Sequence, residues 1–133
     1  MKRKEDRFSV TSRLNSFVHA FRGLTDMIAS ERNAWIHALA TILALDLAWW
    51  LGIDREGFAI IIVAIVIVWM AEAFNTVLEI MANLVAGERY SRSVKRAKDI
   101  AAGAVLIAAI GAVCVGVTVL GPHFWGRVGR FFN

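Results

Sequence analysis

The sequence GFAIIIVAIVIVWM, residues 57–70, has no charged side chain and continues directly into AEAFNTVLEI, residues 71–80. Together the two segments are long and apolar enough to form a membrane-spanning helix. This helix would nevertheless carry Glu72, Asn75 and Glu79. An acidic side chain at the centre of a membrane helix costs about 2.5–3.5 kcal/mol on insertion scales, and ionisable residues in such helices usually mark functional sites. We therefore expect a functional site on this helix.

The composition of the whole chain also indicates a membrane protein. Of its 133 residues, 58% are hydrophobic, whereas soluble domains contain about 45–50% even when glycine is included. The length is that of one domain. We therefore expect residues 1–133 to form a single integral membrane domain with a few spans.

Three apolar segments are expected to cross the membrane as helices, which predicts an all-α membrane protein. They cover approximately residues 35–51, 58–85 and 96–120. The second segment would be about 42 Å long, more than the bilayer core requires, so its last turns should leave the bilayer. Gly121 and Pro122 are expected to end the third span.

Residues 1–28 are expected to form a charged tail followed by an amphipathic helix. Apolar residues recur there at helical spacing, which predicts one apolar stripe: Leu14, Phe17, Val18, Phe21, Leu24, Met27 and Ile28. This helix would either lie at the membrane interface or pack against the protein's own membrane domain.

Lysine and arginine are distributed unevenly among the loops. Seven precede the first span, one lies in the first loop, five lie in the second loop and the start of the third span, and two follow it. Three spans put twelve on one side and three on the other. The positive-inside rule then predicts a cytoplasmic N-terminus and an external C-terminus. The net charge of +4 thus reflects topology, and no motif for nucleic-acid binding accompanies it.

The polar side chains of the second span share one helical face. Glu72, Asn75, Glu79 and Asn83 lie within about 80° of one another on a helix. The stripe begins in the membrane and runs towards the cytoplasm. At the same depth the chain supplies three further groups: Glu31, Lys98 and Asp99.

These residue types suit phosphoryl transfer. That reaction uses a divalent cation held by oxygen ligands, a positive charge near the phosphates and a group that activates the acceptor. Glu31 and Glu79 are candidate Mg²⁺ ligands, and Lys98 is a candidate phosphate contact. Glu72, the deepest of these residues, is a candidate general base for an alcohol presented from the bilayer. No glycine-rich nucleotide motif is present.

These motifs resemble the signature of the small prokaryotic diacylglycerol kinase family, which includes undecaprenol kinases. The resemblance covers about residues 12–120 and rests on four elements: Phe21-Arg22-Gly23-Leu24, Glu31-x-Asn33-x-x-Ile36-His37, Glu72-x-x-Asn75-x-x-x-Glu79 and KRAKDIAAGAVL at residues 95–106. It implies a homotrimer in the bacterial inner (plasma) membrane, with three spans and an N-terminal interfacial helix per subunit. ATP would phosphorylate a lipid alcohol at the cytoplasmic interface, at sites assembled across subunits.

The resemblance also implies individual roles. Glu72 would be the catalytic base, and Glu31 and Glu79 would bind Mg²⁺ and nucleotide. Asn75, Lys98 and Asp99 would bind nucleotide or shape the site. Three positions depart from common family patterns. Many members have an acidic residue where this chain has Asn83. An arginine is common at the position of Trp35, and some diacylglycerol kinases have a serine at that of Ala20.

Several alternatives remain open at this point. The expected reaction converts diacylglycerol to phosphatidic acid, and the first alternative is an undecaprenol kinase that makes undecaprenyl phosphate. A different class is a small non-enzymatic ion or proton channel subunit using Glu72 and Glu79. Asp46 is either a lipid contact or a structural polar group, and His37 is either a site residue or a hydrogen-bonding residue at the headgroup level.

Overall fold

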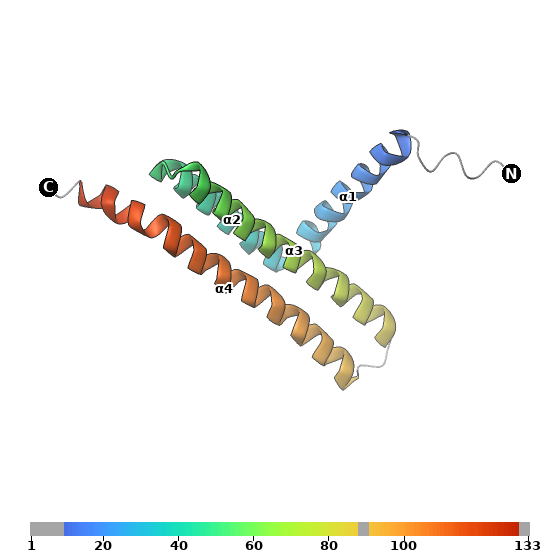
Figure 1. Cartoon of the computed structure of the whole chain (residues 1–133). Coiled ribbons are helices and arrows are strands. Elements are labelled where there is room, and N and C mark those ends of the chain that lie inside the picture. The colour runs from blue at the N-terminus through green and yellow to red at the C-terminus, as the bar shows by residue number, and fades with distance from the viewer. Residues whose placement is uncertain (1–9, 88–90, 131–133) are drawn as a thin grey trace.

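A computed structural model describes residues 10–87 and 91–130, and the regular secondary structure of these residues is entirely helical. Figure 1 shows the four helices, α1 (Val10–Ser30), α2 (Arg32–Leu51), α3 (Arg55–Ala86) and α4 (Arg92–Gly129). The last three are long and apolar enough to cross a membrane. The predicted all-α fold with three spans and a preceding amphipathic helix is therefore confirmed at the level of the single chain.

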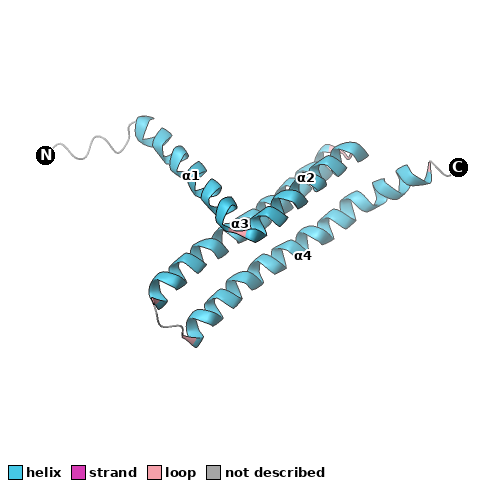
Figure 2. Cartoon of the chain, turned by 180° about the vertical axis from the view of Figure 1, so that it is seen from behind, coloured by secondary structure: helices cyan, strands magenta, loops and turns pink. Residues whose placement is uncertain are grey.

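The three candidate spans form an antiparallel bundle from which α1 diverges. Helices α3 and α4 make the most extensive contact, and α2 packs against both. Figures 1 and 2 show α1 leaving the bundle at an angle, with only its C-terminal end next to α2 and α3. There Met27 is buried. The link between α1 and α2 is thus held against the bundle.

A tight turn joins α2 to α3. Gly52 adopts a left-handed backbone conformation with φ 67°, which glycine tolerates without strain. The Asp54 carboxylate caps α3 by accepting a hydrogen bond of 2.9 Å from the Gly57 backbone N–H. A Cβ atom at Gly57 would lie 2.9 Å from Asp54 Oδ1 and 3.1 Å from Val119 Cγ1. The absence of a side chain therefore allows α4 to approach α3 closely.

The buried apolar core is small and lies near this turn. It contains Ala48, Leu51, Ile61 and Leu120. Most large apolar side chains elsewhere are exposed, such as Ile107 on α4 and Val85 on α3. Exposed apolar side chains are expected on helices whose solvent is lipid, because lipid chains are as apolar as the side chains themselves.

Helix α4 extends further than its sequence indicated. It continues through Pro122 to Gly129 instead of ending at Gly121 and Pro122. Proline removes one backbone hydrogen bond, but membrane helices tolerate this loss. The Arg127 guanidinium lies 4.8 Å from the ring centroid of Trp50, and this cation–π contact attaches the extension to the end of α2.

Among the described residues, the apolar stripe of α1 is covered only near its C-terminal end, where Met27 is buried. Five of its large apolar side chains are exposed: Leu14, Phe17, Val18, Phe21 and Leu24. In the single chain, α1 therefore presents its apolar stripe outward, as a helix at a membrane interface would.

Candidate active site

The buried polar side chains among the described residues gather on one segment of α3. Glu72 is 0% exposed, Asn75 is 4% exposed and Thr76 is 6% exposed. Thr76 is satisfied within its own helix, where its hydroxyl donates to the Glu72 carbonyl oxygen at 3.0 Å. The buried segment thus contains one carboxylate and one amide whose side chains are available for other interactions.

Glu72 on α3 faces His37 on α2. Its Oε2 atom lies 3.7 Å from His37 Nε2. Neither carboxylate oxygen of Glu72 has a hydrogen-bond partner among the described residues, and neither does His37 Nε2. A buried charged or polar group without a partner is costly. These atoms can therefore still form hydrogen bonds, either to a ligand or to each other at a shorter distance.

Trp69 holds the imidazole of His37 from α3. The two rings meet edge to face with their centroids 6.5 Å apart. The Trp69 indole N–H donates a 3.1 Å hydrogen bond to the Thr41 hydroxyl oxygen, one turn after His37 on α2. The contact between α2 and α3 at this level therefore includes a hydrogen bond and an aromatic pair.

The polar stripe continues from Glu72 towards the C-terminal end of α3. The Asn75 amide nitrogen donates to Glu79 Oε1 at 3.4 Å, while Asn75 Oδ1 is buried and lacks a partner among the described residues. Further along, the Lys98 ammonium donates a 2.6 Å hydrogen bond to Asn83 Oδ1. The stripe therefore contacts α2 at one end and α4 at the other.

Of the remaining candidate residues, Lys98 contacts the stripe through Asn83, whereas Glu31 and Asp99 make no hydrogen bond to it among the described residues. Half-buried Glu31 lies between α1 and α2, and its side chain makes no capping hydrogen bond. Asp99 is exposed. In the part of the chain that the structure describes, no hydrogen bond or ion pair joins Lys98 or Asp99 to Glu72.

The donor set fits Mg²⁺ bound together with a nucleotide. Mg²⁺ is usually held by one or two carboxylates plus substrate phosphates and waters. Glu31 and Glu79 provide such oxygen donors. Over residues 10–87 and 91–130, no group of three histidine, cysteine or acidic side chains is arranged to hold a metal ion.

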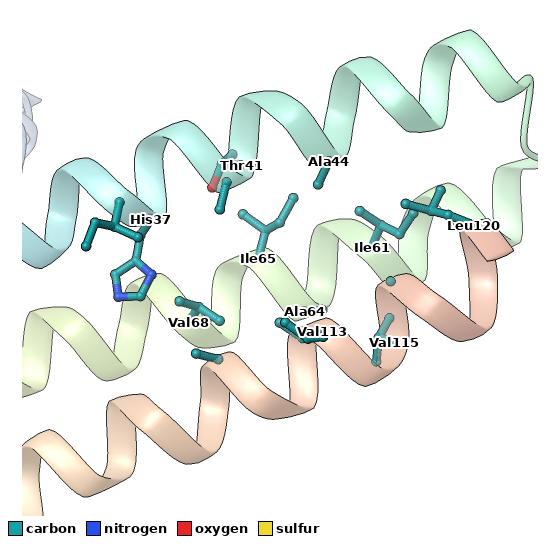
Figure 3. A pocket seen from close by; sticks show the side chains of 15 residues that line it. His37, Thr41, Ala44, Ile61, Ala64, Ile65, Val68, Val113, Val115 and Leu120 are labelled. Carbon is teal, nitrogen blue, oxygen red and sulfur yellow. The ribbon is translucent and has the colours of Figure 1, made fainter. Parts of the chain in front are cut away.

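Two cavities meet at His37. An apolar cavity of about 390 Å³ lies between α2, α3 and α4. Figure 3 shows the His37 side chain pointing from α2 towards α3 at one end of this cavity and Leu120 at the other. A smaller cavity of about 190 Å³ has a more polar lining that includes Asn33, His37 and Asn75. His37 therefore lines both cavities, together with Ile36 and Ala109.

The fold and this site define a class of protein: an integral membrane protein with a buried carboxylate next to a histidine that lines an apolar cavity. The chain matches the family model described as prokaryotic diacylglycerol kinase over residues 18–120. It therefore belongs to the prokaryotic diacylglycerol kinase family, a family of lipid kinases. The resemblance inferred from the sequence motifs is confirmed.

Three relatives illustrate the range of this family. A diacylglycerol kinase of Synechocystis sp. is 38% identical over 109 residues, which are 82% of this chain and 62% of that protein. An undecaprenol kinase of Bacillus subtilis is 30% identical over 92% of this chain and 98% of its own length. A diacylglycerol kinase of Escherichia coli is 33% identical over 70% of this chain and 81% of its own length. The chain thus spans less than two thirds of the Synechocystis relative.

Proposed function

We propose that this protein transfers the γ-phosphate of ATP to the hydroxyl group of diacylglycerol and forms phosphatidic acid and ADP. The observation that carries the proposal is the fully buried Glu72, whose carboxylate lies 3.7 Å from His37, a residue that lines the apolar cavity, in a member of a lipid kinase family. A lipid alcohol reaches such a carboxylate from the bilayer. The hydroxyl oxygen attacks the γ-phosphorus, the bond to the β–γ bridging oxygen breaks, and Glu72 accepts the hydroxyl proton.

The other candidate residues are assigned to the nucleotide. Glu31 and Glu79 would hold Mg²⁺, which neutralises charge on the phosphates when bound. Asn75 lies next to Glu79 and would orient the nucleotide, with Lys98 and Asp99 on α4 as further contacts. The hydrogen bond between Lys98 and Asn83 places the ammonium group beside the polar stripe, as a phosphate contact requires.

The catalytic face is proposed to lie at the cytoplasmic surface of a bacterial inner (plasma) membrane. The excess of lysine and arginine up to the start of α2, and from the end of α3 through the first turns of α4, supports this orientation. The C-terminus would then lie outside. ATP would reach the polar stripe from the cytoplasm, while the lipid would remain in the membrane.

A homotrimer is proposed as the working assembly. In the described part of the chain, Asp99 is exposed, and no hydrogen bond or ion pair joins it to the other site residues. A second groove of about 540 Å³ between α3 and α4 is lined partly by small residues such as Ala108, Gly111 and Ala112, which allow close packing of membrane helices. Neighbouring subunits would fill such grooves and supply the missing site residues.

Undecaprenol is the alternative acceptor. It is favoured by the undecaprenol kinase of Bacillus subtilis, which matches this chain over 98% of its own length. A channel subunit, which buried carboxylates alone would also allow, is disfavoured by the family relationship. The two lipid acceptors share the same chemistry at the hydroxyl and differ in their apolar chains.

A competition assay distinguishes the two acceptors. Purified protein in mixed micelles receives labelled ATP, Mg²⁺ and equal amounts of diacylglycerol and undecaprenol, and the two phosphorylated lipids are separated and counted. We expect phosphatidic acid to be the major labelled product. Predominant undecaprenyl phosphate would replace the proposed acceptor while leaving the kinase assignment intact.

Replacement of Lys98 by methionine is expected to weaken ATP binding. It removes one charge-assisted phosphate contact, so KM for ATP should rise about tenfold. Lys95→Met is the matched control one turn earlier on the same helix, where the side chain is exposed, and it should leave KM within about twofold. Initial rates over a range of ATP concentrations give both values. An equal rise in KM for both variants would contradict a specific role for Lys98.

A further inference from the structure

We propose that His37 is a positioning residue for Glu72: its Nε2–H group holds the Glu72 carboxylate in the orientation that accepts the proton of the lipid hydroxyl. This inference rests on the proposed function, in which Glu72 is the base. The sequence alone left His37 open between a site role and a hydrogen bond at the headgroup level. The structure favours the site role because of the contacts of its ring.

His37 and Glu72 face each other through atoms that lack other hydrogen-bond partners among the described residues. His37 Nε2 lies 3.7 Å from Glu72 Oε2, and the Glu72 side chain is fully buried. Both Glu72 oxygens and His37 Nε2 lack hydrogen bonds among the described residues. Burial removes water as a competing partner. A small side-chain movement would therefore turn this contact into a hydrogen bond without breaking another one.

The imidazole of His37 is held by its surroundings, whereas the side chain of Glu72 has several rotatable bonds. Trp69 contacts the ring edge to face, and its indole is fixed to Thr41 by a 3.1 Å hydrogen bond. A group locked by packing and hydrogen bonds can preorganise its neighbour. Glu72 would thus obtain its orientation from α2 across the helix contact.

The His37 ring lines two cavities that differ in polarity. His37 lines both the apolar cavity of about 390 Å³ and the smaller, more polar cavity that it shares with Asn33 and Asn75. The hydroxyl of an amphipathic acceptor belongs where apolar and polar surroundings meet. The contact between His37 and Glu72 therefore lies at the level where such a hydroxyl would react.

The role of His37 in the reaction involves no bond to the substrate. The lipid hydroxyl proton passes to Glu72 as the oxygen attacks the γ-phosphorus and ADP leaves. His37 donates Nε2–H to the other carboxylate oxygen throughout and keeps its own proton. Loss of this contact should therefore lower kcat and leave the KM for ATP unchanged.

Three substitutions of His37 test this role. Glutamine keeps an N–H donor near the Nε2 position, asparagine places its amide nearer Nδ1, and leucine has no donor. We expect His37→Leu and His37→Asn to lower kcat about 10- to 100-fold, the effect of losing a hydrogen bond to a charged group. His37→Gln should retain kcat within about fivefold of wild type because its donor remains in reach.

The controls separate positioning from loss of folding. His123→Leu makes the same substitution near the end of α4, where the ring bonds only its own helix, and it should leave kcat unchanged. KM for ATP should stay within about twofold in all His37 variants, since no nucleotide contact is removed. Equal kcat values for His37→Gln and His37→Leu would overturn the inference, as would parallel changes in kcat and KM.

A second measurement does not depend on catalysis. The imidazole ¹⁵N resonances of His37 should shift in Glu72→Gln, while those of His19 and His123 stay in place. An unchanged His37 resonance would refute the pairing. If the resonance shifts but the wild-type protein phosphorylates no lipid, the proposed function fails and the contact stands. If lipid is phosphorylated and His37→Leu matches wild type, the inference fails and the function stands.

Discussion

Glu72→Gln is expected to reduce phosphate transfer to the lipid by at least about 100-fold, because general base catalysis contributes about 10²- to 10⁴-fold. The substitution keeps the size of the buried side chain and removes its ability to accept the proton. The measurement is the rate of labelled phosphate incorporation into lipid at saturating ATP and lipid.

The control for this substitution is Thr76→Val, one turn further along α3. Thr76 is also buried, but its hydroxyl only bonds the backbone of its own helix. We expect a rate within about threefold of wild type. Valine has a similar volume, and the hydroxyl that is lost bonds only the backbone of its own helix, so the structure should change little. Near wild-type transfer by Glu72→Gln would remove Glu72 from the role of base.

Glu79→Gln is expected to reduce kcat/KM for ATP by at least about 100-fold, because loss of a carboxylate ligand removes several kcal/mol of metal-dependent stabilisation. Glutamine still accepts the hydrogen bond that Asn75 donates to Oε1 at 3.4 Å, so the local packing is retained. The Mg²⁺ concentration required for half-maximal activity should rise. A titration of activity with Mg²⁺ at fixed ATP measures both effects.

The matched control for Glu79 is Glu56→Gln at the other end of α3. Glu56 is exposed in the first turn of the helix, on the side opposite to the proposed catalytic face. Its loss should leave the Mg²⁺ dependence unchanged. If Glu79→Gln retains the wild-type Mg²⁺ dependence, then Glu79 is not a metal ligand, whatever its effect on the rate.

Patterns confined to one helix were predictable from the sequence. The apolar lengths indicated the three candidate spans, because a helix in lipid must satisfy its backbone internally and be apolar outside. The spacing from Glu72 to Asn83 predicted a polar stripe, and the contacts of Asn75 with Glu79 and of Asn83 with Lys98 follow that stripe. The spans, the stripe and the contact of Asn75 with Glu79 depend on helical periodicity alone, whereas the contact of Lys98 also requires α4 to pack beside α3.

Contacts between helices were less accessible from the sequence. His37 and Glu72 are 35 positions apart on different helices, and α2 is apolar on most sides, so no pattern shows which face it turns to α3. The helix end expected at Gly121 and Pro122 was wrong for a similar reason. The local sequence of α4 does not reveal that Arg127 contacts Trp50 on α2.

Phosphate transfer to a lipid by the purified protein is the decisive test of the proposed kinase activity and of the role of Glu72. Wild-type protein and Glu72→Gln are reconstituted in nanodiscs with diacylglycerol and supplied with Mg²⁺ and ATP labelled at the γ-phosphate. We predict that wild type retains the label in phosphatidic acid in the lipid fraction and that Glu72→Gln does not. Absence of label from the lipid fraction with wild type, or equal labelling with both proteins, would contradict the account.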